Sequence, residues 1–193
     1  MKSILWAGVF LCATSVAFAQ SFEGDISGGP NYISKSAATV SQSSGISYDT
    51  SGWNLGFRMT VNPYRIFGFE VGYIYNRTHL SVSGQDIGGT AIHEGFGDGL
   101  VYLTKEGSRF RPFGAAGVNF NNFIIPGGNS QYGGQNKFGI NYGAGIKVKV
   151  KDKWHVRFDI RQSNTGKPDF GGIQGVSGRL LLTQYSVGFG IGI

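Results

Sequence analysis

Cysteine is nearly absent from this 193-residue sequence, which contains one. That residue, Cys12, follows Phe10 and Leu11 in an apolar stretch, whereas a lipoprotein site requires small residues before its cysteine. The remainder of the chain therefore has no disulfide, no thiol chemistry and no cysteine metal site. Long hydrophobic runs are missing too: after the N-terminal stretch, no segment reaches the roughly 18 apolar residues of a membrane helix. These absences exclude a disulfide scaffold and a helical membrane bundle.

Proline is scarce, with 5 residues, and runs of the helix formers Glu, Leu and Ala are missing, whereas glycine is abundant, with 33 residues. This composition favours a single all-β domain. The chain has 17 Lys and Arg against 11 Asp and Glu. Several of these cations occupy alternating strand positions and form no block, which argues against a nucleic-acid-binding patch.

The N-terminus has the three parts of a secretory signal peptide: a charged start, a short apolar run and a small-residue exit. Lys2 precedes the apolar residues 4–11, and Ala17-Phe18-Ala19 follows. We therefore predict a signal peptide over residues 1–19 and a mature domain over residues 20–193.

The clearest pattern in the mature chain runs from Phe138 to Arg161. Apolar side chains alternate with small, polar or charged ones, and the alternation resumes after Asp152-Lys153. Successive side chains of a strand point to opposite faces, so this segment is predicted to be a hairpin with one apolar and one polar face. The apolar positions are Phe138, Ile140, Tyr142, Ala144, Ile146, Val148, Val150, Trp154, Val156, Phe158 and Ile160.

Similar patterns predict six further strands, at residues 22–33, 53–61, 67–75, 92–103, 111–120 and 179–193. The faces of the strand at 92–103 stay open, because a bulge there would switch them. Long connections (34–51, 76–91, 121–137, 162–177) alternate with short ones (62–65, 104–109, 152–153). In an antiparallel meander, this order places the long loops at one rim and the short turns, with both termini, at the other.

The aromatic side chains decide between a protein core and lipid as the surroundings of the apolar faces. The interior of an eight-stranded barrel barely accommodates its own side chains, so these aromatics would overfill it. Small and polar faces turned inward would fit, and closure would satisfy every backbone hydrogen bond, as a bilayer requires. We therefore predict an all-β, eight-stranded antiparallel up-and-down transmembrane β-barrel, with a secreted soluble β-sandwich or barrel as the alternative. The aromatics expected to face outward are Trp53, Phe57, Phe67, Phe69, Tyr73, Phe138, Tyr142, Trp154, Phe158, Tyr185 and Phe189.

Charged side chains on the inward faces would share a narrow lumen. Because buried charge is costly unless it is paired, we expect Glu70 and Asp159 each to lie between cations. The prediction is a structural charge network that fills the lumen and does not conduct solutes freely. Its members are Arg58, Glu70, Lys147, Lys149, Arg157, Asp159 and Arg161.

With this pattern the chain resembles the small bacterial outer-membrane β-barrels, which include the OmpA-like membrane domain, OmpX-like proteins and opacity-type surface proteins. The C-terminal residues Ser186, Gly188, Ile191 and Ile193 are similar to the family's assembly signal, although a terminal Phe is usual where Ile193 stands. The resemblance implies a monomer in the outer membrane that contacts the barrel-assembly machinery, membrane lipid and lipopolysaccharide. We do not expect the peptidoglycan-binding activity of OmpA-type proteins here.

One short segment, Arg77 to Ser81, is similar to the His-x-Ser of outer-membrane lipid A deacylases. It differs from them because Arg77 is not adjacent to His79 and no Asn follows Ser81. We also judge His93 and His155 too isolated for a metal site, and we expect no cofactor. Long-loop cations would attract anionic lipid phosphates, and Tyr132 and its neighbours could bind an external ligand. The loop cations are Lys35, Arg77, Lys137 and Lys167.

The predicted function is therefore a structural or surface-interaction role in the outer membrane, without catalysis. The alternatives are a lipid A-modifying hydrolase and a secreted soluble binding protein.

Overall fold

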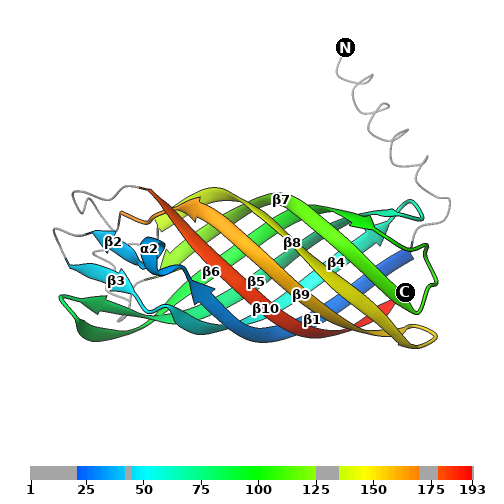
Figure 1. Cartoon of the computed structure of the whole chain (residues 1–193), viewed down its shortest axis with the longest axis horizontal. Helices are drawn as coiled ribbons and strands as arrows, with labels where there is room; N and C mark the ends of the chain where they lie inside the picture. The colour runs from blue at the N-terminus through cyan, green and yellow to red at the C-terminus, as the bar shows by residue number, and fades with distance from the viewer. Residues whose placement is uncertain (1–20, 42–44, 125–134, 170–177, 193) are drawn as a thin grey trace, which may run out of the picture.

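The computed structural model describes residues 21–41, 45–124, 135–169 and 178–192. Within these ranges eight long antiparallel strands close into a barrel, because β1 pairs with both β4 and β10, and β5 pairs with β6 (Figure 1). The barrel strands are β1 (Ser21–Ile33), β4 (Ser51–Asn62), β5 (Phe67–Val82), β6 (Gln85–Tyr102), β7 (Phe110–Ile124), β8 (Gln135–Lys151), β9 (Trp154–Gly166) and β10 (Arg179–Gly192). The predicted signal peptide, residues 1–19, lies outside the described residues. Among the described residues, no helix is long and apolar enough to cross a membrane.

The two rims of the barrel differ. The three predicted short turns are confirmed, since β4–β5, β6–β7 and β8–β9 are joined by residues 63–66, 103–109 and 152–153. The start of β1 and the end of β10 lie at the same rim as these turns, which we call the short-turn rim (Figure 1). At the opposite end, the hairpin rim, lie α2 (Lys35–Ala38), β2 (Thr39–Ser41) and β3 (Ile46–Tyr48). The prediction that residues 34–51 form a loop was therefore wrong: they include α2, β2 and β3, and β3 pairs with β5 and extends the sheet.

The connection predicted over residues 76–91 is instead a long β-hairpin. β5 and β6 pair up to Val82 and Gln85, with a bulge at Leu80/Ser81. Only Ser83 and Gly84 form the turn, with φ angles of 52° and 81°, respectively. Two consecutive residues of positive φ match the twist of hairpin strands. The polar composition of this segment concealed the strands, and a serine in the left-handed region gave no clear turn signal.

β6 pairs without interruption from Ala91 to Tyr102 on its β7 side, so the bulge considered for this strand is not there. Its charged residues Glu94 and Asp98 face the lumen and are buried. Its glycines take the outward positions, which reverses the general expectation that glycine faces inward. These glycines are Gly95, Gly97 and Gly99.

Strand ends at the hairpin rim also extend into the other predicted long loops. β7 continues to Ile124, β8 begins at Gln135, and β9 continues to Gly166. Residues 125–134 and 170–177 of those loops, which include Tyr132, lie outside the described residues.

The outer face of the barrel is apolar and exposed, as predicted. All eleven aromatics expected to face outward are exposed, with exposed fractions from 39% for Trp154 to 79% for Phe138. The side chains between them in sequence are buried in the lumen. The β-sandwich alternative was therefore wrong, because its aromatics would be shielded between two sheets.

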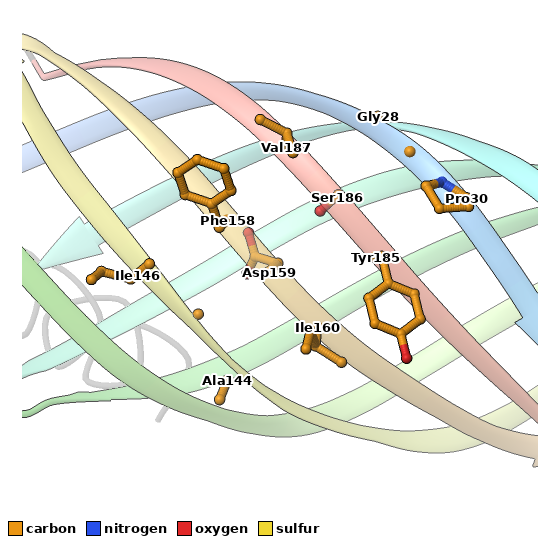
Figure 2. A pocket seen from close by; sticks show the side chains of 12 residues that line it. Gly28, Pro30, Ala144, Ile146, Phe158, Asp159, Ile160, Tyr185, Ser186 and Val187 are labelled. Carbon is orange, nitrogen blue, oxygen red and sulfur yellow. The ribbon is translucent and has the colours of Figure 1, made fainter.

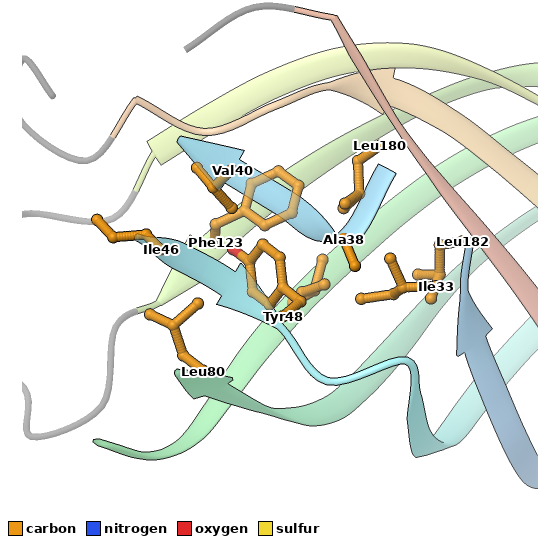
Figure 3. Packing of buried hydrophobic residues seen from close by; sticks show 10 residues of the cluster. Ile33, Ala38, Val40, Ile46, Tyr48, Leu80, Phe123, Leu180 and Leu182 are labelled. Atoms are coloured by element: carbon orange, nitrogen blue, oxygen red, sulfur yellow. The ribbon is translucent and has the colours of Figure 1, made fainter. Parts of the chain in front are cut away.

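Apolar side chains close the lumen at the hairpin rim (Figure 3). We call this group the outer apolar cluster; Tyr48 and Phe123 lie at its centre, with ring centroids 6.5 Å apart. α2, β2 and β3 lie over this end of the barrel and supply part of the cluster. Sequence patterns alone did not reveal it. Its members are Ile33, Ala38, Val40, Ile46, Tyr48, Leu80, Ile92, Phe123, Leu180 and Leu182.

Candidate functional site in the barrel lumen

Arg157 is the hub of the charge network. Its guanidinium donates to Asp159 Oδ2 at 2.6 Å, to Glu70 Oε1 at 2.9 Å and to Asp25 Oδ2 at 3.5 Å. The side chain is fully buried, and its guanidinium carbon lies 4.8 Å from the centroid of the Phe113 ring. One arginine thus joins carboxylates from β1, β5 and β9, which lie far apart in the sequence.

Glu70 lies among three arginines. Besides Arg157, Arg161 Nη2 donates to Glu70 Oε1 at 3.0 Å, and Arg58 Nε lies 3.9 Å from the same oxygen. Thr60 Oγ1 donates to the other carboxylate oxygen at 2.9 Å. A buried carboxylate is tolerated when cations and hydrogen-bond donors surround it in this way.

Arg161 connects the network to β6. It forms an ion pair with Asp98, and its Nε lies 3.5 Å from Asp159 Oδ1. Asp159 therefore lies between two arginines, Arg157 and Arg161. We call the seven linked residues the ion-pair network: Asp25, Arg58, Glu70, Asp98, Arg157, Asp159 and Arg161.

A second charged group lies nearer the short-turn rim. Lys147 and Arg111 both form ion pairs with Glu23, and the Arg111 guanidinium lies 3.5 Å from the Tyr102 ring centroid. Lys147 is buried, as the predicted network requires. Lys149 is exposed and lines a recess of about 330 Å³ at this rim, so the prediction that it belongs to the buried network was wrong. The strand ends there, and the side chain reaches solvent.

His155 is not isolated in the fold. Its Nε2 lies 2.7 Å from Asp25 Oδ1, and Glu23 is close enough that one ligand atom from each of the three residues lies within 4.8 Å of the others. The premise that His155 stands alone was therefore wrong. However, Lys147 and Arg157 already neutralise these two carboxylates, so the group is complete as an ion-pair cluster and does not favour a metal ion.

Inward glycines make room for the large side chains of the network. A Cβ added to Gly145 would come within 2.5 Å of both Phe113 Cζ and the Phe158 carbonyl oxygen. At Gly143 it would come within 2.7 Å of Arg161 Cδ. The glycine positions on β8 are therefore part of how the network fits.

Above the ion-pair network, toward the hairpin rim, carboxamides cross the lumen. Asn31 Nδ2 and Gln184 Nε2 both donate to Asn76 Oδ1, each at 3.1 Å. Gln184 Nε2 also lies 2.6 Å from Glu94 Oε2, and Asn119 Nδ2 lies 2.9 Å from Glu94 Oε1. The lumen is thus layered: ion pairs, then amides, then the outer apolar cluster.

Several lumen residues escaped the sequence analysis. Glu94 and Asp98 share a parity with Leu100 and Tyr102 on β6, but only closure of the barrel reveals which parity points inward. His155 has the parity of Arg157, which was an available signal. Asp25 alternates with Ser27 on a glycine-rich strand that has little apolar contrast. The others are Glu23 and Arg111.

A depression of about 510 Å³ lies on the outside of the barrel, across β1, β10, β9 and β8 (Figure 2). Side chains around it are mainly apolar, among them Phe158, Ile160 and Val187. Asp159 and Ser186 contribute to its floor but are buried on the lumen side. The depression therefore suits an apolar occupant and offers no charged group to a polar substrate.

The His-x-Ser segment lies on the β5–β6 hairpin. His79 Nδ1 lies 2.8 Å from Asp86 Oδ2, and both side chains are more than half exposed. Two hydrogen bonds lower the pKa of Asp86 from its ordinary value of 3.8: the larger effect comes from the backbone N–H of Gly88 and the smaller one from the His79 side chain. Among the described residues, no hydrogen bond joins Ser81 to His79. The segment thus has a histidine–carboxylate pair but no activated hydroxyl.

The structure places the four predicted loop cations as follows. Lys167 Nζ donates to the Thr39 carbonyl oxygen at 2.6 Å, Lys137 Nζ lies 3.8 Å from Asp169 Oδ2, and Arg77 donates to Tyr75 Oη at 3.3 Å. Lys35 is exposed on α2.

On β10, Ser186 is buried toward the lumen, Gly188 has the same parity, and Ile191 has the outward parity. Ile193 lies outside the described residues.

A closed barrel of paired strands with an apolar exterior and a charged, filled interior defines a transmembrane β-barrel protein. A model of the family described as outer membrane protein beta-barrel domain matches residues 4–192. The chain belongs to this family and is an outer-membrane protein.

Solved structures show the same fold. The N-terminal β-barrel domain of Pseudomonas aeruginosa OprF is 16% identical, with a TM-score of 0.54 over 90% of this chain and 97% of that one. OprG from Pseudomonas aeruginosa is 14% identical, with a TM-score of 0.57 over 90% and 95%. Ail, the attachment invasion locus protein of Yersinia pestis, is 11% identical, with a TM-score of 0.56 over 90% and 98%. A search of curated proteins found no match. At these identities the similarity establishes the fold alone.

Proposed function

We propose that this protein is a closed, non-catalytic barrel of the outer membrane with a structural or surface-interaction role. The observation that supports this most is the filled lumen: Arg157 and Arg161 join carboxylates from β1, β5, β6 and β9 across the barrel axis. The outer apolar cluster closes the lumen a second time. Such a barrel anchors its β5–β6 hairpin and the α2–β3 segment at the membrane surface, and it offers no free path to solutes.

The assembly proposal rests on β10. This strand closes the barrel by pairing with both β1 and β9, so we propose that the barrel-assembly machinery recognises Ser186, Gly188, Ile191 and Ile193. In the described part of the chain, each of the eight long strands pairs on both sides, which supports a monomer surrounded by membrane lipid and lipopolysaccharide.

Planar-bilayer recordings test the closed lumen. Purified protein refolded into a bilayer should show no discrete conductance steps at moderate voltage, while a porin inserted in the same way shows them. Reproducible single-channel steps from the wild-type protein would overturn the proposed closed role.

A mass-spectrometric assay tests the absence of catalysis. Lipid A incubated with the folded protein should keep all its acyl chains, because Ser81 is not hydrogen-bonded to His79. Acyl release that disappears in Ser81→Ala, with the barrel still folded, would instead establish the hydrolase alternative.

A further inference from the structure

Glu94 differs from the other buried carboxylates of the lumen. It is 1% exposed, and its oxygens accept hydrogen bonds from two neutral amides, those of Asn119 and Gln184. Among the described residues, no Arg, Lys or His lies within 4.0 Å of it, whereas Glu70 and Asp98 each form an ion pair with an arginine. Burying a carboxylate without a counter-charge is strongly unfavourable. The Glu94 carboxylate therefore has amide partners but no paired cation among the described residues.

The lumen layer around Glu94 has several buried amide atoms without partners among the described residues, both oxygens and nitrogens. Asn121 lies directly across from Glu94 in the β6–β7 ladder and is 1% exposed, yet neither its Oδ1 nor its Nδ2 has a partner in the described protein. Asn119 Oδ1 and Asn31 Oδ1 also have none. Buried amides are normally hydrogen-bonded, so these atoms indicate an additional ligand.

We propose that the Glu94 layer binds one alkali-metal cation, with the Glu94 carboxylate and the Asn119 and Asn121 amide oxygens as ligands. Carboxylate and amide oxygens are the hard ligands that such cations prefer. A half-turn of the Asn119 amide about χ2 exchanges its NH2 for Oδ1, and the cation then replaces the donated hydrogen bond. One carboxylate among neutral amides balances a single positive charge, which favours Na⁺ or K⁺ over a divalent ion.

Unfolding at constant ionic strength tests the site. The protein is refolded into lipid vesicles in mixtures of NaCl and choline chloride, and in mixtures of KCl and choline chloride, with total salt held constant. Choline is a bulky quaternary ammonium ion, so oxygen ligands cannot approach its charge as closely as they approach Na⁺ or K⁺. A ligand that binds only the folded state stabilises it by mass action. We expect the unfolding equilibrium constant to fall about tenfold as Na⁺ or K⁺ replaces choline, which corresponds to a site half-filled at tens of millimolar.

Two variants assign the effect to the site. Glu94→Gln, which keeps the shape but removes the charge, should abolish the alkali-ion dependence. Asn121→Asp, which adds a second carboxylate, should confer an equivalent response to CaCl2. The matched control is Glu106→Gln in an exposed turn, which should keep the wild-type response.

Identical unfolding of wild type in choline and in alkali chlorides would overturn the proposal. In that case water or a proton on Glu94 satisfies the layer. An equal alkali-ion response in wild type and Glu94→Gln would also overturn it. If Glu94→Gln fails to refold, the wild-type comparison and the Asn121→Asp response decide the matter.

Discussion

The two halves of the lumen are closed by different kinds of interaction. In the half toward the short-turn rim, Arg157 and its partners cross the axis as ion pairs. In the half toward the hairpin rim, Phe123, Leu182 and their neighbours close it by apolar packing. The first depends on matched charges from the barrel strands themselves, and the second also needs side chains from α2, β2 and β3. The lumen of one barrel can therefore be closed by ion pairs between its own strands or with the help of additional elements at its end.

Removing the hub of the ion-pair network should have the largest effect. Arg157→Met leaves Glu70, Asp159 and Asp25 buried with fewer counter-charges, so the free energy of unfolding should fall by about 3–5 kcal/mol. Urea titration in lipid vesicles, followed by tryptophan fluorescence, measures this change.

The control for that variant is Lys149→Met, because Lys149 is exposed at the rim and its loss should leave stability nearly unchanged. Equal stabilities for the Arg157→Met and wild-type proteins would show that the ion-pair network does not stabilise the half of the barrel toward the short-turn rim.

Truncating the outer apolar cluster should have a somewhat smaller effect. Leu182→Ala removes a side chain that is 1% exposed and leaves a cavity, which lowers the free energy of unfolding by about 2–4 kcal/mol. The midpoint of the heat-induced mobility shift on SDS gels reports this loss.

Leu103→Ala serves as its matched control, since Leu103 is 79% exposed in a short turn. The packing account of the hairpin rim fails if both leucine variants shift the midpoint equally.

Coupling between the two halves should be the smallest effect. In the β9–β10 ladder Arg157 lies opposite Gly188, six residues along β10 from Leu182. The double variant should therefore lose the sum of the single losses, within about 0.5 kcal/mol. A double-mutant cycle in urea measures the interaction energy. A larger value would mean that the two closures form one cooperative unit.

Much of the barrel followed from alternation in the sequence. The hairpin of β8 and β9 and the outward aromatics such as Trp154 were predicted correctly, because a strand has a period of two. The arginines of β9 were placed on the lumen side for the same reason. β6 was harder to read, because glycines fill one of its faces and remove the apolar contrast that distinguishes outside from inside.

The hairpin rim could not be derived in this way. Ser83 and Gly84 form a two-residue turn inside a polar segment, and strand pairing extends β5 and β6 far beyond their apolar stretches. Tyr48 packs against Phe123 although 75 positions separate them, and no local pattern encodes such a contact.

The sequence by itself determined that strands with one apolar face and one small or polar face would form, because side chains alternate along an extended backbone. Barrel closure decided which carboxylate meets which arginine: it brings Glu70 of β5 to Arg157 of β9, and His155 to Asp25 of β1. Those pairings depend on the register of β1 against β10 across the closing seam. Local sequence cannot specify that register, because the alternation of side chains along a strand is the same whichever residues it pairs with.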